Sequence, residues 1–591
     1  MKIEYKKQSP RREFFKELYE TALRESSDSF SEFERSMAQY RGSHEIDGSD
    51  EPASVVRNIT YEIIESEVSS EIPYPKVDPS YHNEHRGENA AATERLCSSL
   101  RQRLPFETLN DMDERFTYIY GGSVWYVEWD NSQRVGGEIG GVKLHCLSPM
   151  SFIPQPGICN IDDMEYCFLK FTTTRGELVR KYGVREDEAS LAEVEFGFDK
   201  ADTDGDTVRV IVCFFRNEDG EIGQFIFSGD LTLSDIPSYY RRKRTVCRNC
   251  GEEAGGCICT LPSFESEDVL LEHISADELP KRDERFAKRD PDGGITLPYY
   301  VPTRFPIVIR KNTSSEGSLY GQSDCTYIRP EQQAINKIES RILQKLLRSG
   351  ITPIMPEDTS ISLNNSVFGQ IIRMKPGESM SQYGTVDTTP DISQDIAEAE
   401  RLYDHSKRIL GISDAYQGID TNSNESGYAK QLRISQANGR LESKKKMKQS
   451  AYADIDRLIF EHYLAFADEA RALWHTDAYG RVKESEFRRT SFIEYDKTRG
   501  VYYYDDSYLF SVDLNGGGEY QREALWQRNL ENLNAGTLGD KSDPVTLLRY
   551  WQCQERAHYP HARENVEYFR LAVEEKTSLG TRQDDRTPAA E

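Results

Sequence analysis

The stretch PEQQAINKIESRILQKLLRSG, residues 330–350, opens the part of the chain that decides the fold. Aliphatic residues recur in it at three- and four-residue spacing: Ile335, Ile338, Ile342 and Leu346, with Leu343 and Leu347 widening the stripe. Such spacing is typical of an amphipathic helix. Pro330 stands where a first helical residue is favoured, and Gly350 provides a stop signal. The pattern predicts a helix over residues 330–347.

The next 125 residues continue in a distinctive order. Residues 351–390 are rich in short strand signals, and a second helix is predicted over 391–410, with Asp391 and Gln394 in capping-box positions and Gly411 as its end. Its apolar stripe is predicted at Ile396, Ala399, Leu402/Tyr403 and Ile409/Leu410. A polar loop over 412–425 separates it from a long helix over 426–475. Gly439 marks the expected place for a kink or break in that helix.

Both flanks of this region have their own periodicity. Helices are predicted over 14–23, 30–40, 53–68, 93–104, 106–116 and 177–182, with a loop over 74–92. Strands are predicted over 123–129, 142–147, 164–171, 194–198, 208–215, 222–227 and 307–310, the first two forming a hairpin across the glycine-rich residues 136–141. Strands over 502–504 and 509–514 are expected to complete the same sheet, and residues 519–574 to be helical.

Composition excludes several classes of function. The chain has 591 residues, enough for several domains, and a formal net charge of -26, which argues against a general nucleic-acid clamp. No window has the length of a membrane span, and the N-terminus lacks the apolar core of a signal peptide. Eleven cysteines, several in apolar strands, suit a reducing cytoplasm. No P-loop and no nucleophile elbow are present, which disfavours an enzyme of either class.

Four cysteines within thirteen residues form the clearest chemical motif: Cys247, Cys250, Cys257 and Cys259. The first pair has the C-x-x-C spacing of a zinc knuckle, whereas the C-x-C of the second pair is tighter than usual. Four thiolates leave no open coordination position, so we expect a structural zinc. The alternative is a loop with unligated cysteines. The preceding run Arg241–Arg244 is more simply a solvated charge run than a nucleic-acid contact.

Phrases along nearly the whole chain resemble the portal proteins of tailed bacteriophages, in particular those with Gram-positive hosts. They are YRGSHEIDG (40–48), ASVVRNITYEIIES (53–66), ERFTYIYGGSVWYVEWDN (114–131), LSPMSFIPQPG (147–157), SLYGQSDCTYIRPEQQAINKIESRI (318–342), ISDAYQG (412–418) and SGYAKQ (426–431). The order helix, strand-rich segment, helix, loop and long helix is similar to the stem, clip, stem, tunnel loop and long helix of that family.

The resemblance implies a mixed α+β portal architecture with an α/β wing, helical stem, small strand-rich clip, long kinked helix and helical C-terminal crown. It divides the chain into an N-terminal helical part of the wing (1–118), a strand-rich wing (119–326) with a zinc-knuckle insertion around 241–262, a first stem helix (327–350), the clip (351–390), a second stem helix (391–411), the tunnel loop (412–426), the long helix (427–475), strands returning to the wing (476–517) and the crown and C-terminal tail (518–591).

The function implied is that of a homo-oligomeric ring, usually a dodecamer, at one vertex of the capsid. Such a ring is made in the host cytoplasm, lies in the virion and conducts double-stranded DNA, without sequence specificity, during packaging and ejection. Its partners are the terminase large subunit, the neck or adaptor protein, and the major capsid and scaffold proteins, with no membrane involved.

Two groups of residues are the expected contacts with DNA or neighbouring subunits. The tunnel loop offers Asp414, Tyr416, Gln417, Asp420, Asn422, Asn424 and Glu425, whose acidic members would repel phosphates. The long helix offers Arg440, Lys444, Lys445 and Lys448, which cannot all face one side and could line the channel or bridge subunits.

Two other functions remain open from the sequence. One is a nucleic-acid-processing enzyme with a zinc ribbon, such as a nuclease, which the missing catalytic motif disfavours. The other is a non-portal neck or head-completion adaptor, which the helix–strand–helix order disfavours.

Overall fold

The computed structural model describes residues 11–43, 55–81, 84–135, 138–194, 207–250, 259, 263–279, 284–286, 288–348, 351–354, 384–387, 390–412, 427–476, 482–513, 519–556, 559, 562 and 564–573. The protein is mixed α+β, as predicted. It divides into two compact units, one made of Met1–Phe33, Val68–Gln322 and Glu442–Glu591 and the other of Glu34–Glu67 and Ser323–Leu441. The segments predicted as stem, clip and tunnel loop all fall in the second unit, together with part of the predicted wing, residues 34–67.

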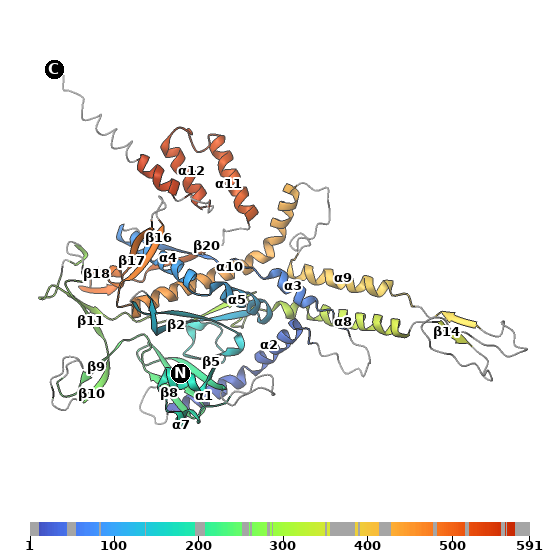
Figure 1. The fold of residues 1–591 in the computed structure, drawn as a ribbon, viewed down its shortest axis with the longest axis horizontal. Coiled ribbons are helices and arrows are strands. Elements are labelled where there is room, and N and C mark those ends of the chain that lie inside the picture. Colours follow the sequence, from blue (N-terminus) through green and yellow to red (C-terminus); the bar gives the residue numbers. More distant parts are fainter. Residues whose placement is uncertain are drawn as a thin grey trace, which may run out of the picture. The chain divides into compact units, whose positions relative to one another are not determined.

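The second unit is built around a pair of antiparallel helices, α8 (Asp324–Arg348) and α9 (Ser393–Leu410) (Figure 1). Ion pairs fix their register: Asp395 at the start of α9 meets Arg341 and Lys345 near the end of α8. At the other end His405 lies 3.1 Å from Glu331. In the sequence between the two helices, β14 (Ile351–Ile354) pairs antiparallel with β15 (Gly384–Asp387), which confirms strand structure in the predicted clip.

An apolar cluster holds α3 (Ile59–Glu67) against this pair. Its buried members are Ile59, Ile63, Ile328, Ile335, Tyr403, Leu410 and Ile412. Polar contacts fix the position of α3 along α8. The buried Gln332 accepts from the backbone N–H of Thr60 at 3.0 Å and donates to the Arg57 carbonyl at 2.7 Å. The predicted stripe therefore faces inward at Ile335, Tyr403 and Leu410.

Helix α8 begins at Asp324, so the prediction that Pro330 is a first helical residue was wrong. The Ser323 hydroxyl instead accepts from the backbone N–H of Cys325 at 3.1 Å, as an N-terminal cap does. Pro330 lies inside the helix on its solvent side, where a missing backbone donor is least costly. The buried Ile328 and Ile335 on either side show that tertiary packing overrides the proline signal.

Helix α9 starts two residues later than predicted and ends as predicted at Leu410, with Gly411 at φ 83°. The Asp391 carboxylate accepts from the backbone N–H of Ser393 at 2.9 Å, in place of the capping box with Gln394. Ile396, predicted to lie on the buried stripe, is exposed. The pattern was wrong there because the buried face of this turn is occupied by Asp395 and its ion pairs.

Helix α10 (Gly427–Phe466) ends nine residues before the predicted end at His475. Its backbone continues through Gly439, so no break occurs there. Residues 471–476 form β16 (Arg471–Thr476), which pairs with β17 (Val482–Phe487). The strand is favoured by contacts distant in sequence, since the Arg471 guanidinium donates to the carbonyl oxygens of Ile139 and Gly140.

Two antiparallel sheets dominate the first unit. The smaller has the order β13–β2–β3, with β2 (Gly122–Val135), β3 (Glu138–Leu147) and β13 (Ile307–Lys311). The larger has the order β4–β5–β6–β7–β8, with β4 (Phe152–Pro154), β5 (Tyr166–Thr174), β6 (Thr207–Arg216), β7 (Ile222–Ser228) and β8 (Leu231–Ile236). Helix α1 (Arg11–Glu25) buries Phe15, Tyr19 and Ala22 in the apolar cluster of that sheet. The predicted hairpin and the strands over 208–215, 222–227 and 307–310 are confirmed within wider bounds, and the strand over 164–171 is confirmed but shifted to Tyr166–Thr174. The strand over 194–198 lies, after Val194, outside the described residues.

Two predictions in the first unit were wrong. The expected loop over 74–92 contains β1 (Tyr74–Pro79) and the start of α4 (Glu84–Arg103), because the buried Arg86 pairs with Asp505 far along the chain. The strands expected to complete the main sheet form separate pairs: β20 (Tyr508–Asp513) with β1, and β19 (Val501–Tyr504) with β18 (Ile493–Asp496).

The remaining helices and strands complete the two units. They are α2 (Ser27–Tyr40), α5 (Phe106–Tyr120), α6 (Arg175–Tyr182), α7 (Glu186–Ala189), β9 (Lys243–Cys247), β10 (Phe264–Asp268), β11 (Leu271–Ile274), β12 (Ile295–Pro298), α11 (Glu519–Asn534) and α12 (Pro544–Arg556). The last two confirm helical structure in the C-terminal part.

A buried charge network joins α5, β13 and α10 in the first unit. Arg310 of β13, with only 2% of its side chain exposed, pairs with Asp113 and lies 2.7 Å from Glu114. Lys448 of α10 lies 3.0 Å from the same Glu114 carboxylate. Burial by itself raises the pKa of Glu114, but the charges of Arg310 and Lys448 hold that pKa at about 2. The indole N–H of Trp125 donates to Asp113 at 2.9 Å, so each carboxylate has several donors.

Replacing Arg310 by Met should destabilise the protein by about 3–5 kcal/mol, because two carboxylates lose their buried partner. Urea unfolding followed by tryptophan fluorescence measures the loss. Arg499→Met is the matched control, since Arg499 pairs with Asp496 on the surface with 83% of its side chain exposed, and should change stability little. An Arg310→Met protein as stable as the control would contradict a structural role for the network.

A second expectation concerns pH. Burial raises the pKa of Glu461 on α10 to about 7, although Arg457 lowers it. Between the ordinary carboxyl pKa and about 7, the folded state holds a proton on Glu461 that the unfolded state has released. The contribution of Glu461 to stability should therefore fall as pH rises through this window, and Glu461→Gln should recover about 3 kcal/mol at pH 8 but nothing at pH 4.

Melting temperatures measured from pH 4 to pH 8 test this. Glu442→Gln changes an exposed glutamate on the same helix and should leave the slope of the wild-type protein intact. Parallel pH profiles for the wild-type and Glu461→Gln proteins would show that Glu461 does not titrate as proposed.

Candidate functional site

Three of the four predicted metal-ligating cysteines come together at the end of a small hairpin. Strands β9 and β10 pair antiparallel, with Cys247, the last residue of β9, opposite Phe264. The next residue, Arg248, donates its backbone N–H to the Ser263 carbonyl at 2.7 Å and closes the hairpin end. A turn over residues 248–250 follows, and Cys259 lies close to Cys247 and Cys250.

The sulfur atoms of Cys247, Cys250 and Cys259 all lie within 4.8 Å of one another. Tetrahedral thiolates around a zinc ion, with metal–sulfur bonds of about 2.3 Å, lie about 3.8 Å apart. Small side-chain rotations therefore suffice to bring the three donors onto one metal ion. Cys247 is buried, Cys259 is partly buried and Cys250 is exposed, so the site lies at the surface but is anchored in the core.

The fourth predicted ligand, Cys257, lies outside the described residues. The three sulfurs that the structure places can hold a metal ion, and their chemistry suits a thiophilic one. Such a site has no nucleophile or general base of its own. Its chemical effect is to cross-link the loop after β9.

The arginine run before these cysteines is engaged in ion pairs. Arg241 pairs with Glu221, Arg242 lies 2.8 Å from Asp468, and Arg244 lies 3.5 Å from Glu267. The interpretation of this run as surface charge, not as a nucleic-acid contact, agrees with these pairs.

The basic residues of the long helix do not form one belt. Lys448 is buried against Glu114, and Lys444 is buried with its ammonium group 5.0 Å from the centre of the Tyr118 ring. The assignment of these two as channel or bridging residues was therefore wrong, because the core of their own unit takes up their charges. Lys445 is exposed and remains available. The side chain of Arg440 lies outside the described part of the chain.

The predicted tunnel loop also lies almost wholly outside the described residues. This holds for Asp414, Tyr416, Gln417, Asp420, Asn422, Asn424 and Glu425. Only Ile412 at its start is described, and it is buried in the apolar cluster of the second unit.

Sequence reasoning missed the charge network around Glu114. Arg310 shares the buried face of the strand IVIRK with Val308, and a charged residue on a buried face is itself a signal of a buried ion pair. Asp113 and Glu114 lie on the buried face of α5, whose pattern can be read only once the helix is known.

Comparison with known proteins adds no family. No family model matches the chain, and a search of curated proteins gives no significant match. Among the described residues, no helix has the length and apolar character needed to cross a bilayer.

The double variant Cys247→Ser, Cys250→Ser should lose the bound metal, because one remaining described sulfur cannot hold it alone. Elemental analysis of protein purified without added metal, expressed per chain, measures this. Cys159→Ser replaces an exposed cysteine outside the cluster and should keep the metal. Full metal content in the double variant would place the metal elsewhere.

Proposed function

We propose that the protein is the portal of a tailed bacteriophage, a ring at one capsid vertex through which double-stranded DNA enters and leaves. The observation that carries the proposal is the order of elements in the second unit. Two antiparallel helices, α8 and α9, are joined through a pair of short strands and followed by the long helix α10. This is the order expected of stem, clip, stem and long helix.

The surface of the helix pair supports assembly with further copies. Leu347 near the end of α8 is 69% exposed, and Ile396 in the first turns of α9 is 47% exposed. Asp395, next to Ile396, bonds to residues of the last turns of α8, so both apolar side chains lie at the same end of the pair. Contacts of one copy with a different face of the next generate a closed ring when the rotation closes.

The charge of the chain suits a DNA conduit better than a DNA clamp. A net charge of -26 disfavours the counterion release that holds cationic proteins on DNA. In this proposal the acidic residues Asp414, Asp420 and Glu425 belong to a tunnel loop at the channel, and Lys445 faces solvent or a neighbouring subunit. The terminase large subunit and later the neck protein dock on the clip, while capsid and scaffold proteins surround the wing. The chain itself carries no catalysis.

We further propose that the metal is zinc, with Cys257 as the fourth ligand. A four-thiolate site is closed and structural. It would hold the loop after β9 on the wing, where an outer surface meets capsid proteins.

A substitution on the helix pair tests the ring. Ile396→Glu places a charge on the proposed contact and should shift the protein from rings to monomers by mass photometry at micromolar concentration. Gln394→Glu adds the same charge at an exposed polar position two residues away and should leave the rings intact. A wild-type chain that stays monomeric, alone and with the capsid proteins, would contradict the portal proposal.

A further inference from the structure

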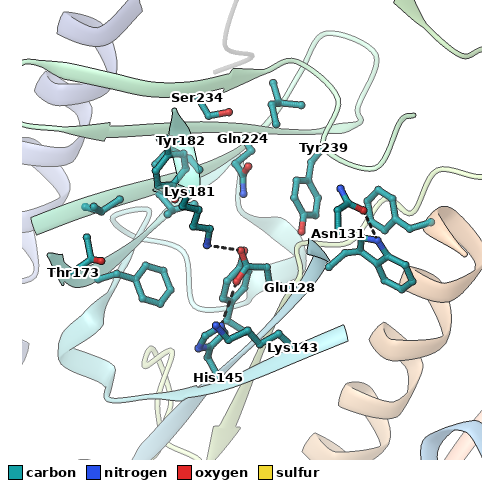
Figure 2. Close-up of a pocket in the computed structure, with 18 of the residues that line it drawn as sticks. Glu128, Asn131, Lys143, His145, Thr173, Lys181, Tyr182, Gln224, Ser234 and Tyr239 are labelled. Carbon is teal, nitrogen blue, oxygen red and sulfur yellow. Dashed lines mark hydrogen bonds and ion pairs between the residues drawn. The ribbon is translucent and has the colours of Figure 1, made fainter. Parts of the chain in front are cut away.

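The first unit contains a cavity of about 800 Å³, and no sequence motif indicates its function. Its walls come from several elements: Tyr126 and Glu128 of β2, Lys143 and His145 of β3, Phe171 of β5, Lys181 and Tyr182 of α6, Gln224 of β7, and Tyr239 with Arg241–Lys243 after β8 (Figure 2). The volume is that of a site for a small molecule.

Glu128 at the centre of this cavity is already neutralised. Lys181 donates to one carboxylate oxygen at 3.0 Å, and His145 lies 3.3 Å from the other, as Figure 2 shows. Burial raises the pKa of Glu128, but the bonds to His145 and Lys181 bring it down to about 2. Glu128 is thus a fixed anion with its partners in place, and it needs no cationic ligand.

Gln224 has no such partner. Only 6% of its side chain is exposed, its amide points into the cavity (Figure 2), and within the described part of the chain it makes no side-chain hydrogen bond. Buried amides are nearly always bonded to protein, water or ligand. An amide offers a donor and an acceptor side by side, which suits the polar edge of a planar ring.

Three exposed charged residues of the lining have no ion pair within the described part of the chain, and lysines outnumber carboxylates among them: Lys143 and Lys243 against Glu177. Lys143 has no carboxylate within ion-pairing distance among the residues that the structure describes, whereas Arg242 is paired with Asp468 and Arg241 with Glu221. Glu177, the remaining carboxylate of the lining, is exposed on α6 and accepts from Thr173 at 3.1 Å. Lys143 interacts electrostatically with Asp130 but has no described carboxylate within ion-pairing distance, so an anion in the cavity can pair with it.

Flat aromatic surfaces complete the cavity. Tyr126 stacks on His145 with ring centres 5.7 Å apart and planes at 19°, and Phe171 packs edge-on against the same imidazole. Tyr182 and Tyr239 line the cavity from α6 and from the segment after β8. Such walls favour a planar ring over a branched aliphatic group.

We propose that this cavity binds a small planar anion, an aromatic or heteroaromatic ring carrying a carboxylate or a phosphate. Gln224 bonds the polar edge of the ring, the aromatic side chains contact its faces, and Lys143 pairs with the anionic group. The inference does not depend on the portal proposal.

Calorimetric titration of the full-length protein tests it with four probes. 4-Hydroxybenzoate represents a ring that carries a carboxylate, and adenosine 5′-monophosphate represents a ring that carries a phosphate. Adenosine lacks the charge, and inorganic phosphate lacks the ring. At least one of the two ring anions should bind with a Kd below about 1 mM, at least tenfold tighter than adenosine and phosphate. The ring anion that binds shows whether the cavity prefers a carboxylate or a phosphate.

Variants then assign the contacts. Lys143→Met and Gln224→Met should each weaken binding by about tenfold, the loss expected for one hydrogen bond to a charged or buried group. Lys143 is exposed, so its substitution should not affect folding, and Lys497→Met, which removes an exposed lysine far from the lining, is the matched control. The proposal is overturned if neither ring anion binds, if phosphate alone binds as tightly, or if Lys143→Met and the control bind equally.

Discussion

The first unit depends on one buried cation. Arg310 enters the core on β13, and its charge is tolerable there only because α5 supplies Asp113 and Glu114 at the same place. Glu114 in turn requires a second positive charge, which α10 supplies with Lys448. The ion pairs thus bring together segments that are distant in sequence: Arg310 lies 197 residues from Asp113, and Lys448 lies still farther from Glu114. Apolar packing alone tolerates small shifts of a strand or a helix, whereas a buried carboxylate with three donors does not. The network therefore fixes the position of α10 against the β13–β2–β3 sheet.

The second unit is stabilised mainly by apolar packing instead of by buried charges. Its helices meet through aliphatic side chains, and polar residues act at the edges to set register: Gln332 bonds α8 to α3, and Asp395 ties the ends of α8 and α9. The same device explains why Ile396 stays outside. A turn of α9 that directs the Asp395 carboxylate toward α8 cannot also bury the next residue, so Ile396 is left on the surface.

Local chemistry predicted most of the elements, and its failures have a common cause. The helix over residues 330–347 with its buried Ile335 and Ile342, the stop at Gly411 and the hairpin of β2 and β3 depend on neighbours in sequence, and the structure has them. The stripe does not extend to Leu346 and Leu347, which are exposed. The wrong predictions depend on distant partners: residues 471–476 are held as a strand by the carbonyl oxygens of β3, and β1 exists because β20 pairs with it. The same division holds for the sites. The cysteine spacing predicted the thiol cluster, because its ligands are close in sequence. The cavity drew no prediction, because Glu128, Lys181 and Gln224 come from three elements whose meeting no spacing shows.

The thiol cluster and the cavity share one strand. Strand β9 begins at Lys243, which lines the cavity, and ends at Cys247, a member of the cluster. Among the described strands only β10 pairs with it, and its buried residues are Val246 and Cys247 at its far end. A metal ion bound to Cys247 would restrain the far end of β9 and with it the segment 241–243 that closes the cavity. Loss of the metal should then loosen this wall while leaving Glu128, Lys143 and Gln224 on their own sheets. A structural metal can in this way strengthen ligand binding without contacting the ligand. A wall that the metal has already ordered loses less conformational entropy when the ligand binds.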